Sequence, residues 1–124
     1  MPMTIYEAVG GAETFERLVE GFYAAVAGDP VLRPLYPEDL SAPRRHLTLF
    51  LMQYFGGPST YSEERGHPQL RARHLPFVIG RAERDAWVRH MSEALDTLDL
   101  SELVKGQMRS YFDGAATFLV NRPE

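Results

Sequence analysis

The chain has 124 residues, with 13 Lys and Arg against 17 Asp and Glu and a net charge of −4. This length predicts a single domain over residues 1–124 that buries roughly two-thirds of its unfolded surface. The weak charge, with both signs interspersed, excludes an extended surface for nucleic acid or anionic membrane. Because the sequence has no cysteine, disulfides, a thiolate nucleophile and an iron–sulfur cluster are excluded, and a cytoplasmic location is expected.

The first half of the chain predicts three helices separated by glycine and proline. A short helix is expected over residues 4–9, followed by a longer one in which apolar residues recur at helical spacing from Phe15 to Val26. Prolines then break about ten residues into turns. A third helix is expected to begin with Ser41 as its N-cap and to end before Gly56.

The second half predicts an irregular loop over residues 59–66, a short helix that carries His74, and two long helices over residues 81–98 and 101–121. No convincing alternation of apolar and polar residues indicates a strand. The longest nearly apolar run, residues 47–55, is too short to span a bilayer, and no signal peptide is recognisable. The sequence therefore predicts a soluble, all-α protein.

His74 stands in the most informative segment, Gly66-His67-Pro68-Gln69-Leu70-Arg71-Ala72-Arg73-His74-Leu75-Pro76-Phe77. Its prolines leave room for less than two helical turns, which is too little to be stable alone in water. We therefore expect a group outside the chain to hold this segment. A neutral imidazole beside guanidinium groups suits haem, whose iron takes an axial histidine and whose propionates pair with arginine.

The other three histidines are weaker candidates. His46, early in a predicted helix, is expected to be solvated. His67 precedes a proline and is expected either in a plain loop role or in contact with a carboxylate. His90 follows Trp87 by three residues and is expected to be partly buried, with no metal partner at ligand spacing.

Three polar aromatic residues allow two interpretations each. Tyr23 borders the buried stripe of its helix, so its phenol either bonds a backbone carbonyl in the core or points into a ligand cavity. Trp87 is either packing mass or a hydrogen-bond donor to an electron-rich ligand atom. Tyr36, between prolines, is either a surface ring or a third donor.

The sequence lacks HExxH, GxSxG and a glycine-rich phosphate loop.

Together these features resemble the truncated haemoglobins of the second group, and the resemblance covers nearly the whole chain. It implies a two-over-two helical sandwich that encloses haem b, iron protoporphyrin IX. The motifs that carry it are Tyr6 to Gly11, Phe22-Tyr23, Tyr36-Pro37-Glu38-Asp39, Gln53 to Pro58, Tyr61-Ser62-Glu63, Gly66 to Phe77, and Glu83 to Trp87.

The resemblance also implies roles for individual residues. His74 is implied as the proximal iron ligand, with the sixth coordination site left for a diatomic molecule. Tyr23, Tyr36 and Trp87 match the polar distal residues that surround the bound ligand. The positions that match haem contacts are Leu47, Phe50, Leu51, Tyr54, Tyr61, Arg71, Arg73 and Phe77.

Two positions depart from the family pattern. Phe55 stands where relatives commonly have tryptophan, which removes an indole N–H but keeps a large aromatic ring. Pro43 falls near the position of the distal histidine of ordinary globins, where relatives of this group often have alanine.

The implied function is reversible binding of O₂ and other diatomic ligands at a five-coordinate iron. Preorganised distal donors stabilise a retained ligand, so slow O₂ release is expected, together with nitric oxide oxidation or peroxide use. An enzymatic cycle needs an external reductase, because the chain has no recognisable flavin or nicotinamide motif. The alternatives are O₂ storage, delivery or sensing without turnover, and a haem-free helical interaction module. CO is a further expected ligand, and a homo-oligomer is left open.

Overall fold

The computed structural model describes residues 3–122, and within that range it contains helices and no strand. This confirms the predicted all-α fold. The elements are α1 (Ile5–Ala8), α2 (Ala12–Ala27), the 3₁₀-helix η1 (Arg33–Leu35), α3 (Ser41–Tyr54), α4 (Thr60–Arg65), α5 (Leu70–His74), α6 (Arg81–Asp96) and α7 (Glu102–Phe118).

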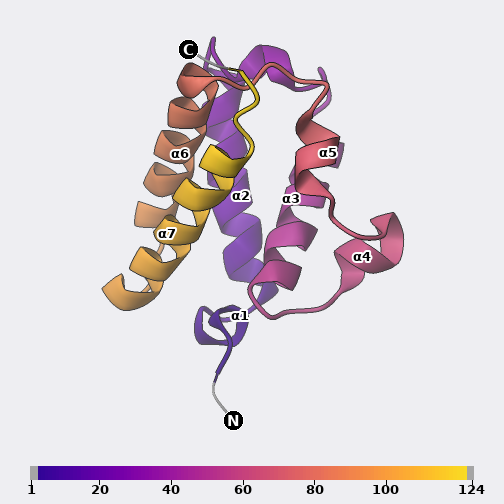
Figure 1. Ribbon diagram of the computed structural model, residues 1–124. Helices are drawn as coiled ribbons and strands as arrows, with labels where there is room; N and C mark the ends of the chain where they lie inside the picture. The colour runs from indigo at the N-terminus through magenta and orange to yellow at the C-terminus, as the bar shows by residue number, and fades with distance from the viewer. Residues whose placement is uncertain (1–2, 123–124) are drawn as a thin grey trace.

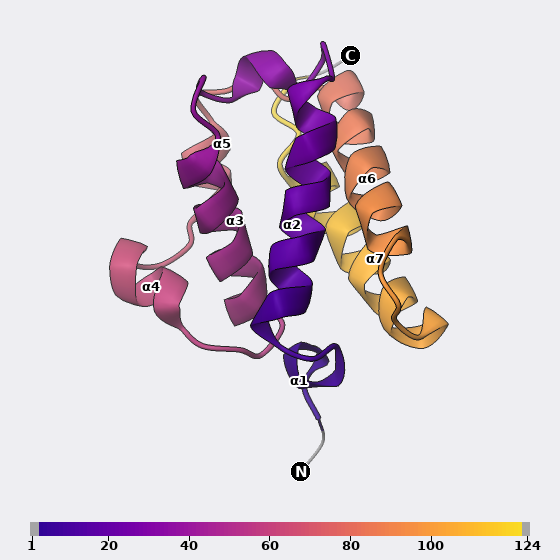
Figure 2. The ribbon, with the colours of Figure 1, turned by 180° about the vertical axis from the view of Figure 1, so that it is seen from behind.

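The four long helices form two packed pairs. Helix α2 packs against both α3 and α6, and α6 packs against α7. The pair α2–α3 thus covers the pair α6–α7, while the short helices α4 and α5 lie beyond α3 (Figures 1 and 2). This arrangement is the two-over-two sandwich expected from the resemblance. In the described range no helix is both long and apolar enough to cross a membrane.

The core lies where α2, α6 and α7 meet, and it is rich in aromatic rings. Phe15, Phe22 and Phe112 are fully buried. The Trp87 ring lies edge-on to Phe22, with centroids 5.3 Å apart, and edge-on to Phe112 at 5.9 Å. Burial of one such side chain contributes about 1.5–3 kcal/mol. The core therefore fixes the face of α6 that carries Trp87.

Helix α1 closes one end of the sandwich by packing on the turn after α3. The Tyr6 N–H donates to the carbonyl of Phe55 at 2.9 Å. A Cβ atom at Gly57 would lie 2.6 Å from the Tyr6 ring, and one at Gly56, whose φ is +99°, would lie 2.6 Å from the Thr4 side chain. Glycine is needed at both positions because the two segments approach so closely.

Three local predictions were wrong. Ser41 is the first residue of α3 and not its N-cap, because its N–H is taken up by the Asp39 carboxylate at 2.9 Å. The predicted loop over residues 59–66 contains α4, which Gln53 holds by accepting the Ser62 N–H at 3.0 Å. The last helix ends at Phe118, since the backbone of Asn121 bonds the Ile79 carbonyl at 2.8 Å.

Candidate functional site

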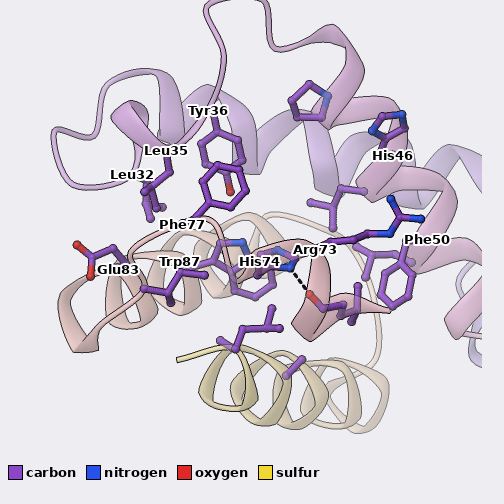
Figure 3. Close-up of a pocket in the computed structure, with 18 of the residues that line it drawn as sticks. Leu32, Leu35, Tyr36, His46, Phe50, Arg73, His74, Phe77, Glu83 and Trp87 are labelled. Carbon is purple, nitrogen blue, oxygen red and sulfur yellow. Dashed lines mark hydrogen bonds between the residues drawn. The ribbon is translucent and has the colours of Figure 1, made fainter. Parts of the chain in front are cut away.

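A cavity of about 370 Å³ lies between the two layers, and its walls are mostly apolar. That volume is in the range of small-molecule and cofactor sites. His74, Tyr23, Tyr36 and Trp87 all line it, although they come from four different parts of the chain. Figure 3 shows His74, Tyr36 and Trp87 around the cavity. The structure thus brings together the predicted ligand and the three predicted donors.

The His74 ring is oriented by a backbone carbonyl. Its Nδ1 atom lies 2.6 Å from the Leu70 carbonyl oxygen, the bond dashed in Figure 3. A carbonyl only accepts, so Nδ1 carries the proton and the neutral ring keeps the lone pair of Nε2 free. A donated Nδ1 proton is the usual way in which proteins orient a metal-binding histidine. His74 therefore offers one bond to a metal whose other ligands come with it, as in haem.

Helix α5 also has hydrogen-bond partners within the chain, in addition to the external group that the sequence predicts for this segment. The Arg73 guanidinium donates to the carbonyls of Pro68 at 2.8 Å and Arg65 at 2.9 Å. From the C-terminal segment, the Asn121 amide donates to the carbonyls of His74 at 3.2 Å and Phe77 at 2.9 Å. The five-residue helix is too short to be stable alone, but these bonds fix both of its ends.

The three polar aromatic residues converge on one oxygen atom. The side chains of Tyr23 and Trp87 both hydrogen bond to the hydroxyl of Tyr36. Indole is only a donor, so Tyr36 accepts from Trp87. The bond with Tyr23 raises the pKa of Tyr23 and lowers that of Tyr36, as expected when Tyr23 donates. The O–H of Tyr36 is then left to donate into the cavity, toward which its phenol points in Figure 3.

Burial keeps the Tyr36 phenol protonated. Desolvation is the largest effect on its pKa and outweighs the two accepted bonds, so that the pKa rises to about 12. The Tyr23 pKa is also raised, first by burial. Of the two interpretations of Tyr23, the structure agrees with a phenol at the cavity, because its partner is another side chain and not a backbone carbonyl. At neutral pH both groups are hydrogen-bond donors.

Positive charge gathers at the rim of the cavity near α3 and α4. His46, Arg65 and Arg73 all line the cavity, and Arg65 contacts His46 Nδ1. Burial lowers the pKa of His46, and the charges of Arg65, Arg45 and Arg73 lower it further. His46 is therefore a half-buried rim residue, which corrects the expectation that it is solvated. An excess of guanidinium groups at the edge of an apolar cavity fits the carboxylates of haem.

The remaining predicted haem contacts fall into two groups. Leu47, Phe50, Leu51, Tyr61, Arg73 and Phe77 line the cavity. Tyr54 and Arg71 instead line a shallow neighbouring hollow. There Tyr54 is 53% exposed and stacks on Tyr111 with centroids 3.9 Å apart, and Arg71 lies over the Phe118 ring and donates to its carbonyl at 2.8 Å.

The two departures from the family pattern lie in different surroundings. Phe55 is a buried core residue, edge-on to Phe112 with centroids 6.1 Å apart, and it is not among the lining residues. Pro43 lines the cavity from the first turn of α3. The loss of an indole N–H at Phe55 therefore affects the packing of the core rather than the polar groups of the cavity.

Sequence reasoning missed several lining residues. Ala115 and Leu119 follow helical spacing in the sequence, but the sequence does not show that this side of the helix faces the cavity. Leu32 and Ile79 come from irregular segments and Leu35 from the three-residue η1, and none of these segments has a periodic signal. The lining residues outside the predicted contact set are Leu32, Leu35, Pro37, Pro43, His46, Arg65, Leu70, Ile79, Glu83, Arg84, Tyr111, Ala115, Ala116 and Leu119.

Comparisons with known proteins agree with this geometry. Residues 4–120 match the family model described as bacterial-like globin. The chain is 44% identical over 123 residues to group 2 truncated haemoglobin YjbI of Bacillus subtilis, covering 96% of this chain and 89% of that protein. Two solved structures superpose closely. One is a thermostable haemoglobin from Thermobifida fusca (57% identity, TM-score 0.95, 98% of this chain and 100% of that chain). The other is the group II truncated haemoglobin from Bacillus anthracis (41% identity, TM-score 0.96, 100% and 95%).

Proposed function

This chain belongs to the group II truncated haemoglobins, and on that premise we propose that it binds O₂ reversibly at a five-coordinate haem and releases it slowly. Family membership implies haem, which argues against a haem-free helical module. We propose haem b as the specific group, with His74 as its protein ligand. Haem supplies an iron that binds diatomic ligands and exchanges single electrons.

The observation that carries the proposal is the arrangement of donors around Tyr36. Tyr23 and Trp87 both hydrogen bond to its oxygen, so the phenol is oriented before any ligand arrives. A donor that is already oriented loses little freedom when it binds an acceptor. A hydrogen bond to a group with charge character contributes about 1.5–3 kcal/mol, which corresponds to roughly one to two powers of ten in affinity. Such a gain should appear mainly as slower release.

The other cavity residues bind and orient. His46, Arg65 and Arg73 would hold carboxylates at the rim, while Leu47, Phe50 and Leu51 would exclude water from the apolar face. Arg71 is not in this set, because it lies outside the cavity lining and its guanidinium lies over the Phe118 ring. The Leu70 carbonyl holds the proton of His74 at Nδ1.

Slow release is unsuited to delivery, so we propose redox use of the retained ligand, either nitric oxide oxidation or peroxide consumption. Both need electrons from a reductase that is still to be identified. A cytoplasmic location is consistent with the absence of cysteine and stays a prediction from the sequence.

The first test is the absorption spectrum of the purified protein in its ferric and dithionite-reduced forms, before and after CO. We expect a Soret band that shifts with CO. Absence of a Soret band after addition of hemin would overturn the proposal.

The second test replaces both Tyr23 and Trp87 by Phe, which should speed O₂ release by about ten- to a hundredfold. An unchanged rate would disprove the role of the donors.

Turnover is tested separately. Nitric oxide consumption is measured with O₂ and a reducing system, and compared with the His74→Ala protein. Sustained consumption well above that control supports the redox role. Consumption limited to a single turnover in spite of continuous reduction would favour storage or sensing.

A further inference from the structure

A buried carboxylate stands at the end of α2, outside the cavity. Asp29 is 7% exposed. One of its oxygens, Oδ1, accepts the N–H of Val31 at 2.6 Å and that of Leu32 at 3.2 Å. This arrangement shapes the turn that leads from α2 to η1. Leu32, which the turn fixes, lines the cavity.

The other oxygen of Asp29 faces α6. His90 Nε2 bonds Oδ2, and the Arg89 guanidinium approaches the same atom at 3.5 Å. The His90 side chain is 13% exposed, and its Nδ1 atom lies 3.6 Å from the Glu93 carboxylate. Among the described residues, Nδ1 has no hydrogen-bond partner. The hydrogen bond from His90 is also the largest cause of the lowered pKa of Asp29.

From Asp29, a chain of hydrogen bonds continues to Tyr36. The Arg33 N–H donates to the carbonyl of Asp29 at 2.9 Å. The Arg33 guanidinium then donates to the carbonyls of Tyr36 at 3.2 Å and Pro37 at 3.0 Å. The backbone of Tyr36 is therefore fixed relative to Asp29, over a segment that contains only the short helix η1.

Helix α6 holds this segment at both of its ends. Trp87 bonds the hydroxyl of Tyr36, and His90 bonds Asp29. The two residues are three positions apart and therefore lie on one face of the helix. If the contact between His90 and Asp29 is lost, α6 holds this segment only through Trp87. The Tyr36 phenol is then less firmly fixed relative to Trp87.

We propose that His90 is a positioning residue for the Tyr36 hydroxyl, acting through Asp29 and the turn at residues 29–36. His90 does not touch the cavity and contacts no ligand itself. The inference rests on the proposed function, because it assumes that Tyr36 donates to a bound ligand. The inference adds that the geometry of the Tyr36 donor depends on the contact between His90 and Asp29, which lies outside the cavity.

The test uses the haem-loaded protein, with CO bound for the exchange measurement and with O₂ bound for the release measurement. His90→Leu removes the donor and keeps an apolar side chain, whereas His90→Gln keeps an amide N–H that can reach Asp29. Trp87 is the one tryptophan of the chain, so the protein has a single indole N–H resonance. We expect His90→Leu to speed hydrogen exchange at this indole by about tenfold and O₂ release by about fivefold, because part of a distal hydrogen bond is lost.

The controls separate positioning from general loosening. His90→Gln should restore both rates to within about twofold of the wild type, because a neutral hydrogen bond replaces the original contact. Asp96 lies on α6 like His90, and Asp96→Asn removes its exposed ion pair with Arg109 of α7. This substitution should leave both rates unchanged. Indole exchange and O₂ release at wild-type rates in His90→Leu would overturn the inference, as would equal acceleration in Asp96→Asn.

A double-mutant cycle with Tyr36→Phe gives the sharper result. If His90 acts through Tyr36, adding His90→Leu to Tyr36→Phe should not accelerate O₂ release further, whereas a merely structural role predicts that the two effects multiply. The outcomes also distinguish the two proposals. If Tyr36→Phe itself leaves release unchanged, the proposed function fails. If Tyr36→Phe accelerates release and His90→Leu does not, only the role of His90 fails.

Discussion

The two sides of the cavity are built in different ways. On the distal side, Tyr23 and Trp87 belong to long helices whose rings pack in the aromatic core. On the proximal side, His74 stands on a five-residue helix that is held by hydrogen bonds to backbone carbonyls. Packing in the core thus fixes the donors Tyr23 and Trp87, whereas a few hydrogen bonds fix the helix that carries His74. From this difference we predict that substitutions on the two sides will affect cofactor retention and ligand release separately.

The largest effect should come from removing the proximal ligand. His74→Ala leaves the cavity without the imidazole whose Nδ1 is anchored to Leu70. We expect the protein to lose haem to an apomyoglobin acceptor at least about a hundredfold faster, because an axial metal bond is lost. The decay of the Soret band measures this rate. Unchanged haem retention at neutral pH, without added imidazole, would contradict the assignment.

The next effect concerns the distal side alone. Tyr36→Phe removes the hydroxyl on which Tyr23 and Trp87 converge. O₂ release, followed by stopped-flow displacement with CO, should become about ten- to a hundredfold faster. Haem loss should stay within about twofold of the wild type if the two sides are independent. A change in both rates of similar size would break the comparison.

A third substitution affects the proximal side without touching His74 chemically. Asn121→Ala removes the amide that bonds the carbonyls of His74 and Phe77 and the N–H of Ile79. Each bond contributes about 0.5–1.5 kcal/mol, so haem loss should be several-fold faster and the Tm lower. Arg122→Ala, a change at the next residue, is the matched control. O₂ release should be unchanged in both proteins.

The smallest effect is that of alkaline pH on the distal donor. Because burial raises the pKa of Tyr36 to about 12, its phenol keeps its proton in the folded protein when the unfolded phenol, near 10, has lost its own. The folded state then binds more protons, so this group's contribution to stability is complete below pH 10 and is lost between about 10 and 12. O₂ release should therefore stay constant from pH 7 through about pH 10, because Tyr36 keeps its proton there. A change in the release rate with a midpoint near about 10, the ordinary pKa of an exposed phenol, would contradict the burial of Tyr36.

The sequence predicted the fold and four residues that meet at the cavity, because their signals are local. Helical periodicity and glycine or proline breaks defined the long helices, and short motifs carried His74, Tyr23, Tyr36 and Trp87. Helix α4 was missed because six residues give little periodicity, and its position depends on the contact between Gln53 and Ser62.

The rim of the cavity was harder to predict because it depends on orientation. Arg71 and Arg73 are two residues apart on α5, which separates them by roughly 200° around the helix. Both matched haem contacts in the sequence, yet Arg73 lines the cavity and Arg71 faces Phe118. Arg65 and His46 come from different helices and meet only in the folded chain. Pairs of this kind have no sequence spacing from which they could be recognised.

The arrangement around Tyr36 also has a consequence for selectivity. Its oxygen already receives hydrogen bonds from Tyr23 and Trp87, so this group can give a hydrogen but has little capacity to take another. A ligand that only accepts, such as O₂ or nitric oxide, finds its complement here. A ligand that must also give a hydrogen, such as water or hydrogen sulfide, leaves that hydrogen without a partner at Tyr36. We therefore expect the cluster to discriminate between ligands by the direction of the hydrogen bond as well as by its strength.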